Sequence, residues 1–262
     1  MFKILVYHGI VERTDSFDGY FPKNISIEKF RSQIDALKKK TKFLSLSEFE
    51  KKWQKRDLRN NEAMLFFDDC YQSALNGLKV LKEYEIPAVI ALSTDLVEKG
   101  YSWIDDIEKI LPDDFEEIIR LKKRFRNISL GKVSGELEKL SRVYGINPRR
   151  AKQKKFDIVS WREIKQIRLM GFDIVHHGHF HYPMSRLSDR DLFKDIETNV
   201  EMLKKKLNIE PHSFVYPFGE KEDYNGKTKA ILKDFGFRFA FSAGKGGVNY
   251  NDPFAIPRVN SY

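Results

Sequence analysis

Histidine is strongly clustered in this chain of 262 residues, because four of its six histidines fall in the run Val175-His176-His177-Gly178-His179-Phe180-His181. Histidine is the commonest protein ligand for zinc and similar ions, so we interpret the cluster first as a metal site. His177 and His181 form the best ligand pair, since they follow an expected strand and their spacing lets the chain curl round one ion. Pro183 follows them and discourages a continuing helix.

The other two histidines of the run are weaker candidates. His176 is more readily explained as a strand residue that faces away from the site, and His179 as a residue that lies in solvent or beside the ligands. The helical motif of zinc proteases does not fit the run, because Gly178 stands where that motif has its glutamate.

Two adjacent carboxylates, Asp68 and Asp69, follow the apolar run Met64-Leu65-Phe66-Phe67. Neighbours on a regular strand face opposite sides, so both can reach one site only if the chain bends at Asp69. A divalent ion needs one carboxylate as a ligand, and the other could accept a proton from an attacking water. Alternatively, one of the two only caps the helix that begins near Tyr71.

The elements that must position these residues alternate between short apolar runs and amphipathic segments. Strands are expected at residues 2–7, 43–46, 63–67, 87–93, 172–175, 214–216 and 237–242. Helices are expected to begin at Ser26, at a Ser47–Glu50 capping box, at Ser73, at Ser160 with Glu163, at Ser188 with Asp191, and at Lys227. Repeated β-then-α units imply a parallel sheet, and about seven or eight of them favour a barrel.

The candidate residues coincide with strand ends. The following six each lie at or just past the end of an expected strand: His8, Asp68, Asp69, His177, Tyr216 and Arg258. Ligands collect at the carboxyl ends of parallel strands in barrels and open sheets alike, so we expect these side chains to meet at one rim. Polar residues also follow strands merely because the core has ended, so each residue alone is a weaker indication than the set.

Residues 101–156 interrupt the alternation with a polar, mostly helical segment, which we interpret as an insertion in a strand-to-helix loop that could cover the site. The net charge of +9 is concentrated here, because residues 120–155 hold 13 Lys and Arg against 2 Asp and Glu. This basic segment could bind an anionic partner, such as a nucleotide-sugar diphosphate, a lipid pyrophosphate, an acidic glycan or a phospholipid membrane surface. The alternative is a solvated helical face.

Composition narrows the class of protein. Hydrophobic residues at 41% indicate a globular chain, which we expect to form a single domain over residues 1–262. The lone Cys70 excludes an internal disulfide, the N-terminal apolar run is too short for a secretory signal, and no stretch approaches the roughly 20 apolar residues of a membrane span. We therefore expect a soluble, cytoplasmic protein. The basic segment lacks the interleaved aromatics and motifs of nucleic-acid binders, so no nucleic-acid partner is expected.

Three motifs in series resemble those of the polysaccharide deacetylases, the NodB-homology domain of carbohydrate esterase family 4. Phe66-Phe67-Asp68-Asp69-Cys70-Tyr71 resembles TFDDGY, His177-Gly178-His179-Phe180-His181 resembles H-S/T-x-x-H, and Phe214-Val215-Tyr216-Pro217-Phe218-Gly219 resembles the third motif. The opening Leu5-Val6-Tyr7-His8-Gly9-Ile10, together with Ile27-Glu28-Lys29-Phe30 and Gln33, is similar to the subgroup that contains the biofilm poly-N-acetylglucosamine deacetylases. The resemblance covers nearly the whole chain outside the insertion.

This resemblance implies a distorted (β/α)7-type barrel and metal-dependent hydrolysis of an N-acetyl group on an amino sugar in surface-polysaccharide metabolism. It implies that Asp69, His177 and His181 hold one divalent metal ion, which we expect to be zinc, with cobalt, nickel or manganese as alternatives. Asp68 would be the general base. The expected partner is an N-acetylated saccharide, nucleotide-linked and lipid-linked forms included.

The resemblance also implies roles for residues outside the metal cluster. His8 would be the general acid, because no late Leu-x-His motif is present and the subgroup with an early Tyr-His uses that histidine. The Phe218 amide would donate to the oxyanion, and Tyr216 is expected at the same substrate site. Val215 stands where many members have an arginine that orients the catalytic aspartate, so we hypothesise that Arg258 pairs with Asp68 instead.

Three departures from the family motifs motivate a second class of function. Cys70 stands in place of glycine, Gly178 in place of the Ser or Thr that braces the metal loop, and Val215 in place of the arginine. The second class is a catalytically impaired, metal-containing barrel that binds carbohydrate or anionic head groups. A bound metal without turnover of any acetylated sugar would favour it.

Overall fold

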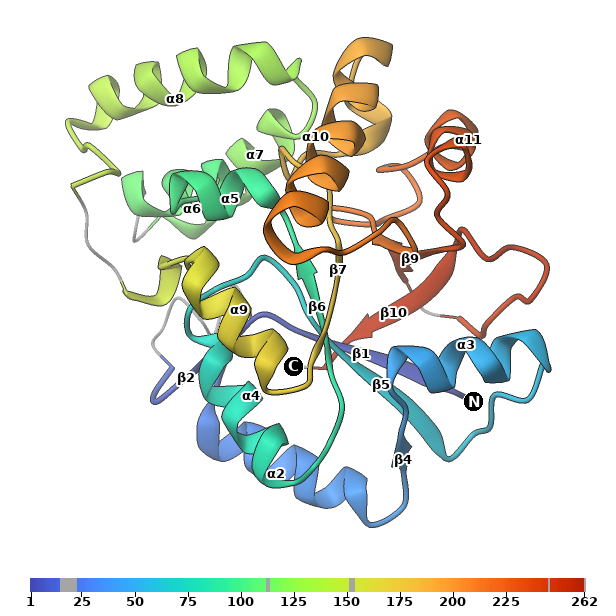
Figure 1. Ribbon diagram of the computed structural model, residues 1–262. Helices are drawn as coiled ribbons and strands as arrows, with labels where there is room; N and C mark the ends of the chain where they lie inside the picture. Colours follow the sequence, from blue (N-terminus) through green and yellow to red (C-terminus); the bar gives the residue numbers. More distant parts are fainter. Residues whose placement is uncertain (15–22, 112–113, 151–153, 245, 262) are drawn as a thin grey trace.

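A computed structural model describes residues 1–14, 23–111, 114–150, 154–244 and 246–261. Within these residues, seven parallel strands form a barrel: β1 (Lys3–Tyr7), β5 (Glu62–Phe67), β6 (Val89–Leu92), β7 (Asp173–His176), β8 (Ser213–Val215), β9 (Phe239–Ala243) and β10 (Ile256–Asn260). The barrel closes because β1 pairs with β5 on one side and with β10 on the other. A short strand, β4 (Lys42–Phe43), pairs with β5 outside the ring. The distorted (β/α)7-type barrel predicted from the sequence is confirmed (Figure 1).

Alternation along the strands explains how the barrel positions polar residues. Val6, Phe66 and Val175 pack together in the apolar cluster inside the barrel. Side chains two residues apart on a strand share a face, so the same inward face next carries three polar residues. These are His8, Asp68 and His177, and all three line one cavity at the carboxyl ends of the strands.

Six helices follow the strands around the barrel: α2 (Ile27–Lys38), α3 (Leu46–Gln54), α4 (Ala74–Glu83), α9 (Trp161–Leu169), α10 (Asp189–Leu207) and α11 (Gly226–Asp234). Ser26, Ser160 and Ser188 cap α2, α9 and α10 with their side chains, as their spacing predicts. Two short strands, β2 (Gly9–Val11) and β3 (Asn24–Ser26), pair with each other, and the 3-10 turn η2 (Met184–Arg186) precedes α10.

One helix begins earlier than the sequence predicts. The N-cap of α3 is Ser45, whose side chain and that of Glu48 form the capping box, so the Ser47–Glu50 prediction was wrong by two residues. Two Ser-x-x-Glu sequences overlap at this point. The earlier one gains further support, because the backbone N–H of Leu46 donates to the Asp173 carboxylate at 3.2 Å and the Leu46 side chain packs against the barrel core.

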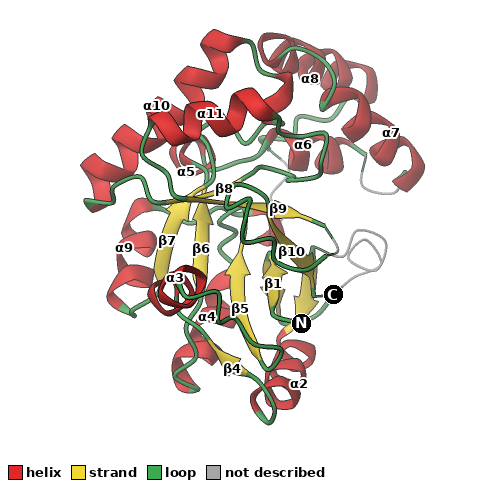
Figure 2. Cartoon of the chain, turned by 90° about the vertical axis from the view of Figure 1, so that its right-hand side faces the viewer, coloured by secondary structure: helices red, strands yellow, loops and turns green. Residues whose placement is uncertain are grey.

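The predicted insertion lies between β6 and α9 and is helical. After α5 (Thr94–Lys99) it contains α6 (Trp103–Ile110), α7 (Phe115–Phe125), α8 (Leu130–Tyr144) and the 3-10 turn η1 (Lys154–Phe156). Its residues 112–113 and 151–153 lie outside the described residues. Figure 2 shows α6, α7 and α8 beyond the carboxyl ends of β5, β6 and β7, and every residue of α6 is buried. None of the described helices combines the length and apolarity needed to cross a membrane.

Candidate metal centre and active site

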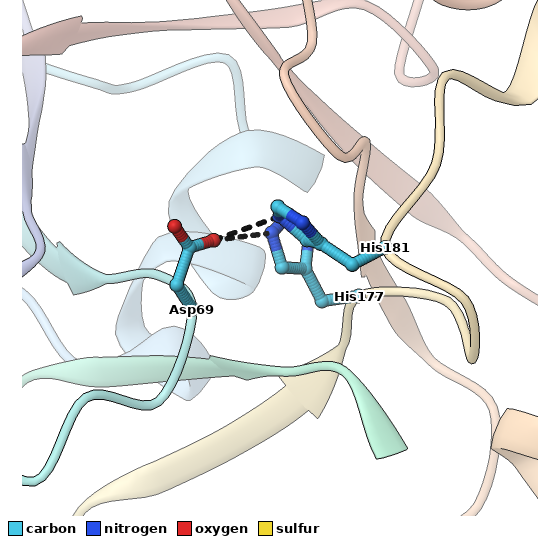
Figure 3. Close-up of side chains that lie close together, drawn as sticks. All are labelled: Asp69, His177 and His181. Atoms are coloured by element: carbon cyan, nitrogen blue, oxygen red, sulfur yellow. Dashed lines mark ion pairs between the residues drawn. The ribbon is translucent and has the colours of Figure 1, made fainter. Parts of the chain in front are cut away.

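Asp69, His177 and His181 meet at the carboxyl end of the barrel. All three residues are buried, and their ligating atoms lie within 4.8 Å of one another. Oδ1 of Asp69 lies 2.8 Å from Nε2 of His181 and 3.6 Å from Nε2 of His177, and Figure 3 shows both rings approaching the carboxylate. One carboxylate oxygen and two imidazole nitrogens are a donor set that suits zinc and similar divalent ions. The residues present therefore fit the expected metal ion.

The chain bends after β5, as the adjacent carboxylates require. Asp69 and Cys70 have φ angles of 65° and 59°, in the left-handed region that favours glycine. Neither carboxylate caps α4, whose N-cap Ser73 makes no side-chain cap bond. Cys70 is buried, and its Sγ donates to the carbonyl oxygen of Ala91 at 3.2 Å. Burial raises the pKa of the Cys70 thiol well above its usual value, so this side chain is a neutral packing residue.

A backbone carbonyl group orients the ring of His177, whereas His181 is held through its own backbone. Nδ1 of His177 lies 2.8 Å from the carbonyl oxygen of Val215. A carbonyl oxygen only accepts, so Nδ1 carries the proton and Nε2 presents its lone pair to the cluster. The carbonyl oxygen of His181 accepts a hydrogen bond of 3.1 Å from Nε1 of Trp103 in α6. The insertion thus supports the second histidine of the pair.

The other histidines of the run lie outside the cluster. His176 faces away, as predicted, because its Nδ1 lies 2.8 Å from Oδ1 of Asn199 and its ring packs edge-on against Phe237. Nδ1 of His179 lies 2.8 Å from Oγ1 of Thr94. Both residues therefore bind neighbouring elements, and neither belongs to the group that could hold an ion.

A buried aspartate that the sequence analysis missed braces the metal loop. Oδ1 of Asp195, in α10, accepts hydrogen bonds from the backbone N–H groups of His179 (3.0 Å) and Phe180 (2.6 Å). Gly178 has a φ of 70°, and a Cβ atom there would lie 2.5 Å from Oδ2 of Asp195. Burial raises the pKa of Asp195 to about 7. Gly178 stands where the family motif has Ser or Thr. The Asp195 carboxylate, from α10, lies where the Cβ atom of such a residue would be crowded.

Arg258 pairs with Asp68, as hypothesised from the sequence. Nη1 and Nη2 of Arg258 donate to the two carboxylate oxygens of Asp68, each at 2.8 Å, and both side chains are buried. Burial raises the pKa of Asp68, but the charge of Arg258, with smaller contributions from His177 and His8, outweighs it and leaves the pKa below its usual value. Asp68 is therefore ionised at neutral pH.

A cavity of about 260 Å³ contains the candidate residues. Nε2 of His8 lies 3.9 Å from Oδ2 of Asp69, and burial lowers the pKa of His8, partly offset by the charge of Asp69. The insertion contributes Ile104 and Arg126 to the lining. The cavity brings together seven of the residues predicted from the sequence: His8, Asp68, Asp69, His177, His181, Phe218 and Arg258.

Phe218 lines the cavity, whereas Tyr216 does not. Phe218 has a φ of 61°, and the centroid of its ring lies 5.2 Å from that of His181. Tyr216 is fully buried and its hydroxyl donates to the carbonyl oxygen of Phe254 at 3.0 Å, outside the cavity lining. The Tyr216 side chain does not line the cavity, because the alternation that turns Val215 into the barrel turns Tyr216 toward the outer helices. The expected place of Tyr216 at the substrate site stays a prediction.

The basic segment is partly neutralised within the molecule. At least seven of its described Lys and Arg side chains form ion pairs: Arg120 with Glu117, Lys122 with Glu108, Arg124 and Lys139 with Glu136, Arg126 with Asp223, Arg142 with Glu138, and Arg149 with Asp106. Intramolecular pairing reduces the positive charge that this face presents to an anionic partner.

Sequence comparison agrees with the geometry of the site. The sequence model of the polysaccharide deacetylase family matches residues 55–240, so the chain belongs to this family. No curated protein sequence matches the chain significantly. Membership in this family, together with the barrel, supports a hydrolytic deacetylase.

Solved deacetylase structures share the fold over nearly the whole chain. The deacetylase PplD of Streptococcus pyogenes, solved in complex with acetate, is 16% identical, with a TM-score of 0.70 over 99% of this chain and 92% of that one. IcaB from Ammonifex degensii is 19% identical, with a TM-score of 0.66 and coverage of 100% and 91%. The BpsB deacetylase domain from Bordetella bronchiseptica is 16% identical, with a TM-score of 0.63 and coverage of 99% and 95%. At these identities the likeness establishes the fold alone.

Proposed function

We propose that the protein is a metal-dependent hydrolase that removes N-acetyl groups from an amino sugar in a surface polysaccharide or its precursor. One observation carries the proposal: the Asp69, His177 and His181 cluster shares a cavity with the ion-paired Asp68. A set of metal ligands next to a separate ionised carboxylate suits metal-assisted hydrolysis of an amide by water. Family membership supports the same reaction class.

Asp69, His177 and His181 would hold the ion, which we propose to be zinc; cobalt, nickel and manganese are alternatives. When bound, such an ion supplies Lewis-acid polarisation of the acetyl carbonyl and favours deprotonation of water. The fixed proton on Nδ1 of His177 keeps Nε2 available as a ligand. Burial of all three residues restricts access of bulk water to the cluster.

Asp68 would accept the proton of the attacking water. Its pairing with Arg258 keeps the carboxylate ionised and fixes its orientation toward the cavity. The same pairing makes the carboxylate a weaker base than an isolated buried aspartate, because the positive charge stabilises the ionised form. Arg258 is thus a positioning residue that exchanges some basicity for orientation.

His8 would donate a proton to the departing amine, since it lines the same cavity and its Nε2 lies 3.9 Å from Oδ2 of Asp69. The Phe218 amide would donate a hydrogen bond to the oxyanion that develops on the acetyl oxygen. Phe218 has a left-handed backbone conformation three residues after β8, and it lines the same cavity as the candidate metal ligands.

Two substitutions test the proposal. Asp68→Asn should keep the metal but lower acetate release by at least about 100-fold, the usual contribution of a general base. His177→Ala should lose both metal and activity. Metal content by elemental analysis and acetate release from N-acetylated saccharides provide the two readouts. Full activity in either variant would contradict the assignment, and unit metal content without turnover of any acetylated saccharide would favour the impaired binding barrel instead.

A further inference from the structure

His176 is a buried histidine that takes no part in the proposed reaction. It is the last residue of β7, is 1% exposed and precedes the candidate ligand His177, but it is not in the group of described residues that could hold an ion. Its Nδ1 lies 2.8 Å from Oδ1 of Asn199, which is fully buried in α10. Buried polar side chains persist where they are hydrogen-bonded, so this pair indicates a role for His176 outside the metal cluster.

The contacts of the Asn199 amide fix its orientation. Its Nδ2 lies 2.7 Å from the carbonyl oxygen of Gly178 and 3.1 Å from that of Leu92, with a longer contact of 3.3 Å to Oγ1 of Thr94. Carbonyl oxygens only accept hydrogen bonds, so the amide nitrogen faces them and Oδ1 faces His176. Oδ1 also only accepts, so Nδ1 of His176 carries the proton. His176 therefore donates to the amide, and the amide donates to the two carbonyl groups.

These two carbonyl groups flank the backbone of His177. Gly178 follows His177 directly, and the carbonyl oxygen of Leu92 also accepts from the backbone N–H of His177 at 3.2 Å. Ser93 adds a hydrogen bond of 2.7 Å from its hydroxyl to the carbonyl oxygen of His177. The single side chain of Asn199 thus holds the chain on both sides of this candidate ligand. The position of the His177 imidazole depends on that backbone.

A second residue of α10 holds the same loop, residues 177–181, from the same helix face. Asp195 lies one turn before Asn199, and residues four apart on a helix are neighbours. Asp195 accepts from two backbone N–H groups of the loop, whereas Asn199 donates to the carbonyl group of Gly178. The backbone N–H of Thr94 donates to the same carbonyl oxygen at a longer distance of 3.3 Å. The loop is therefore supported by side chains that are distant in sequence, and Gly178 itself has none to contribute.

We propose that His176 and Asn199 are positioning residues for the metal centre: His176 orients the Asn199 amide, and that amide fixes the backbone on both sides of His177. The family motif has a Ser or Thr at the Gly178 position to brace this loop, so the pair supplies from β7 and α10 the support that Gly178 lacks. The inference rests on the proposed function, because it takes His177 as a metal ligand. It assigns His176 a role that is neither ligation nor packing alone.

Zinc affinity, measured by titration calorimetry, tests the two residues separately. Asn199→Leu keeps the size of the side chain but removes both amide donors, so the affinity should fall by about 10- to 100-fold, the usual effect of changing a residue that supports a metal ligand. His176→Phe keeps a ring against Phe237 but removes the Nδ1 donor, so the affinity should fall by about two- to tenfold, the equivalent of one hydrogen bond. The visible absorption of the cobalt-loaded protein should change in both variants, because a displaced imidazole alters the coordination geometry.

The double variant tests whether His176 acts through Asn199. With Leu at position 199 there is no amide to orient, so adding His176→Phe should lower the zinc affinity by less than about twofold. Additive losses would mean that the two side chains act independently and would overturn the inference. If Asn199→Leu does not fold, Asn199→Ala takes its place in the same comparison.

Asn76→Leu is the matched control, because Nδ2 of Asn76, in α4, donates to the carbonyl oxygen of Ile10 at 2.8 Å, away from the loop. It should leave the zinc affinity and the cobalt spectrum unchanged. Unaltered zinc affinity in Asn199→Leu, or an equal loss in Asn76→Leu, would overturn the inference and leave the proposed function standing. Absence of zinc and cobalt binding by the unaltered protein would overturn both.

Discussion

Asp68 and Asp69 are neighbours in the chain, yet they have different partners. Arg258 binds Asp68 in a bidentate pair, whereas His177 and His181 surround Asp69. Two adjacent carboxylates repel each other when both are ionised, and separate positive or metal-binding partners remove that penalty. The backbone bend at Asp69 makes the separation geometrically possible. The adjacent carboxylates predict that one binds an ion and the other accepts a proton, and only the family resemblance says which residue takes which role.

At the residue scale, Asp195 and Gly178 are coupled, because the absence of a side chain at Gly178 leaves room for the Asp195 carboxylate. Asp195→Ala leaves two backbone amides of the metal loop without their acceptor, at about 1–3 kcal/mol for each unsatisfied group. Gly178→Ser places a side chain against Oδ2 of Asp195 in a left-handed backbone conformation. Each substitution alone should weaken zinc binding, measured by calorimetry. The double variant should bind zinc better than the two single losses predict, because the clash is removed; strictly additive losses would contradict this coupling.

At the scale of elements, the insertion contacts both chain segments that carry the candidate metal ligands, the one after β5 and the one after β7. Trp103 of α6 binds the carbonyl group of His181, and Asp105 of α6 accepts a hydrogen bond of 2.8 Å from the hydroxyl of Tyr71, two residues after Asp69. Lys23 also pairs with Asp105 at 2.8 Å. Burial raises the pKa of Asp105, and the charge of Lys23 opposes that shift. α6 is therefore a buried support of the site, although half of its residues are charged.

Trp103→Phe tests this support. The substitution keeps an aromatic ring in the same core but removes the hydrogen bond to His181, so we expect zinc affinity to fall by about two- to tenfold, the equivalent of about 0.5–1.5 kcal/mol. Trp161→Phe is the matched control, because Nε1 of Trp161 donates to Glu98 on the exterior of the protein. It should leave zinc affinity unchanged. Equal losses in the two variants would show that the bond to His181 has no special role.

Most of the elements can be predicted from the sequence, and the exceptions have physical causes. Apolar runs and serine caps locate the strands and helices because these signals are local. The choice between Ser45 and Ser47 as the cap of α3 depends on Asp173, which is distant in sequence. The family motif predicts Tyr216 at the substrate site, and the sequence pattern alone does not show that strand alternation turns its side chain away from the cavity. Asp195 carried one sequence signal, a charged residue on the apolar face of α10.

At the scale of the whole molecule, a ligand that binds only the folded state stabilises it. Zinc at about 100 times its Kd should add about 2.7 kcal/mol to the free energy of unfolding and raise Tm by several degrees. Thermal unfolding with zinc and with a chelator measures the shift. His177→Ala should abolish it. His212→Ala should retain it, because His212 pairs with Glu50 away from the cluster. Equal shifts in both variants would place the ion elsewhere.

The closure of the barrel also sets an order of events during synthesis. β1 pairs with β10, and Asp68 is separated from its partner Arg258 by 190 positions in the chain. Until β10 emerges from the ribosome and docks between β1 and β9, the inward carboxylate of Asp68 has no guanidinium beside it. The cavity can therefore mature only after translation of the last strand, and a nascent chain halted before it would expose an open edge of the sheet to chaperones.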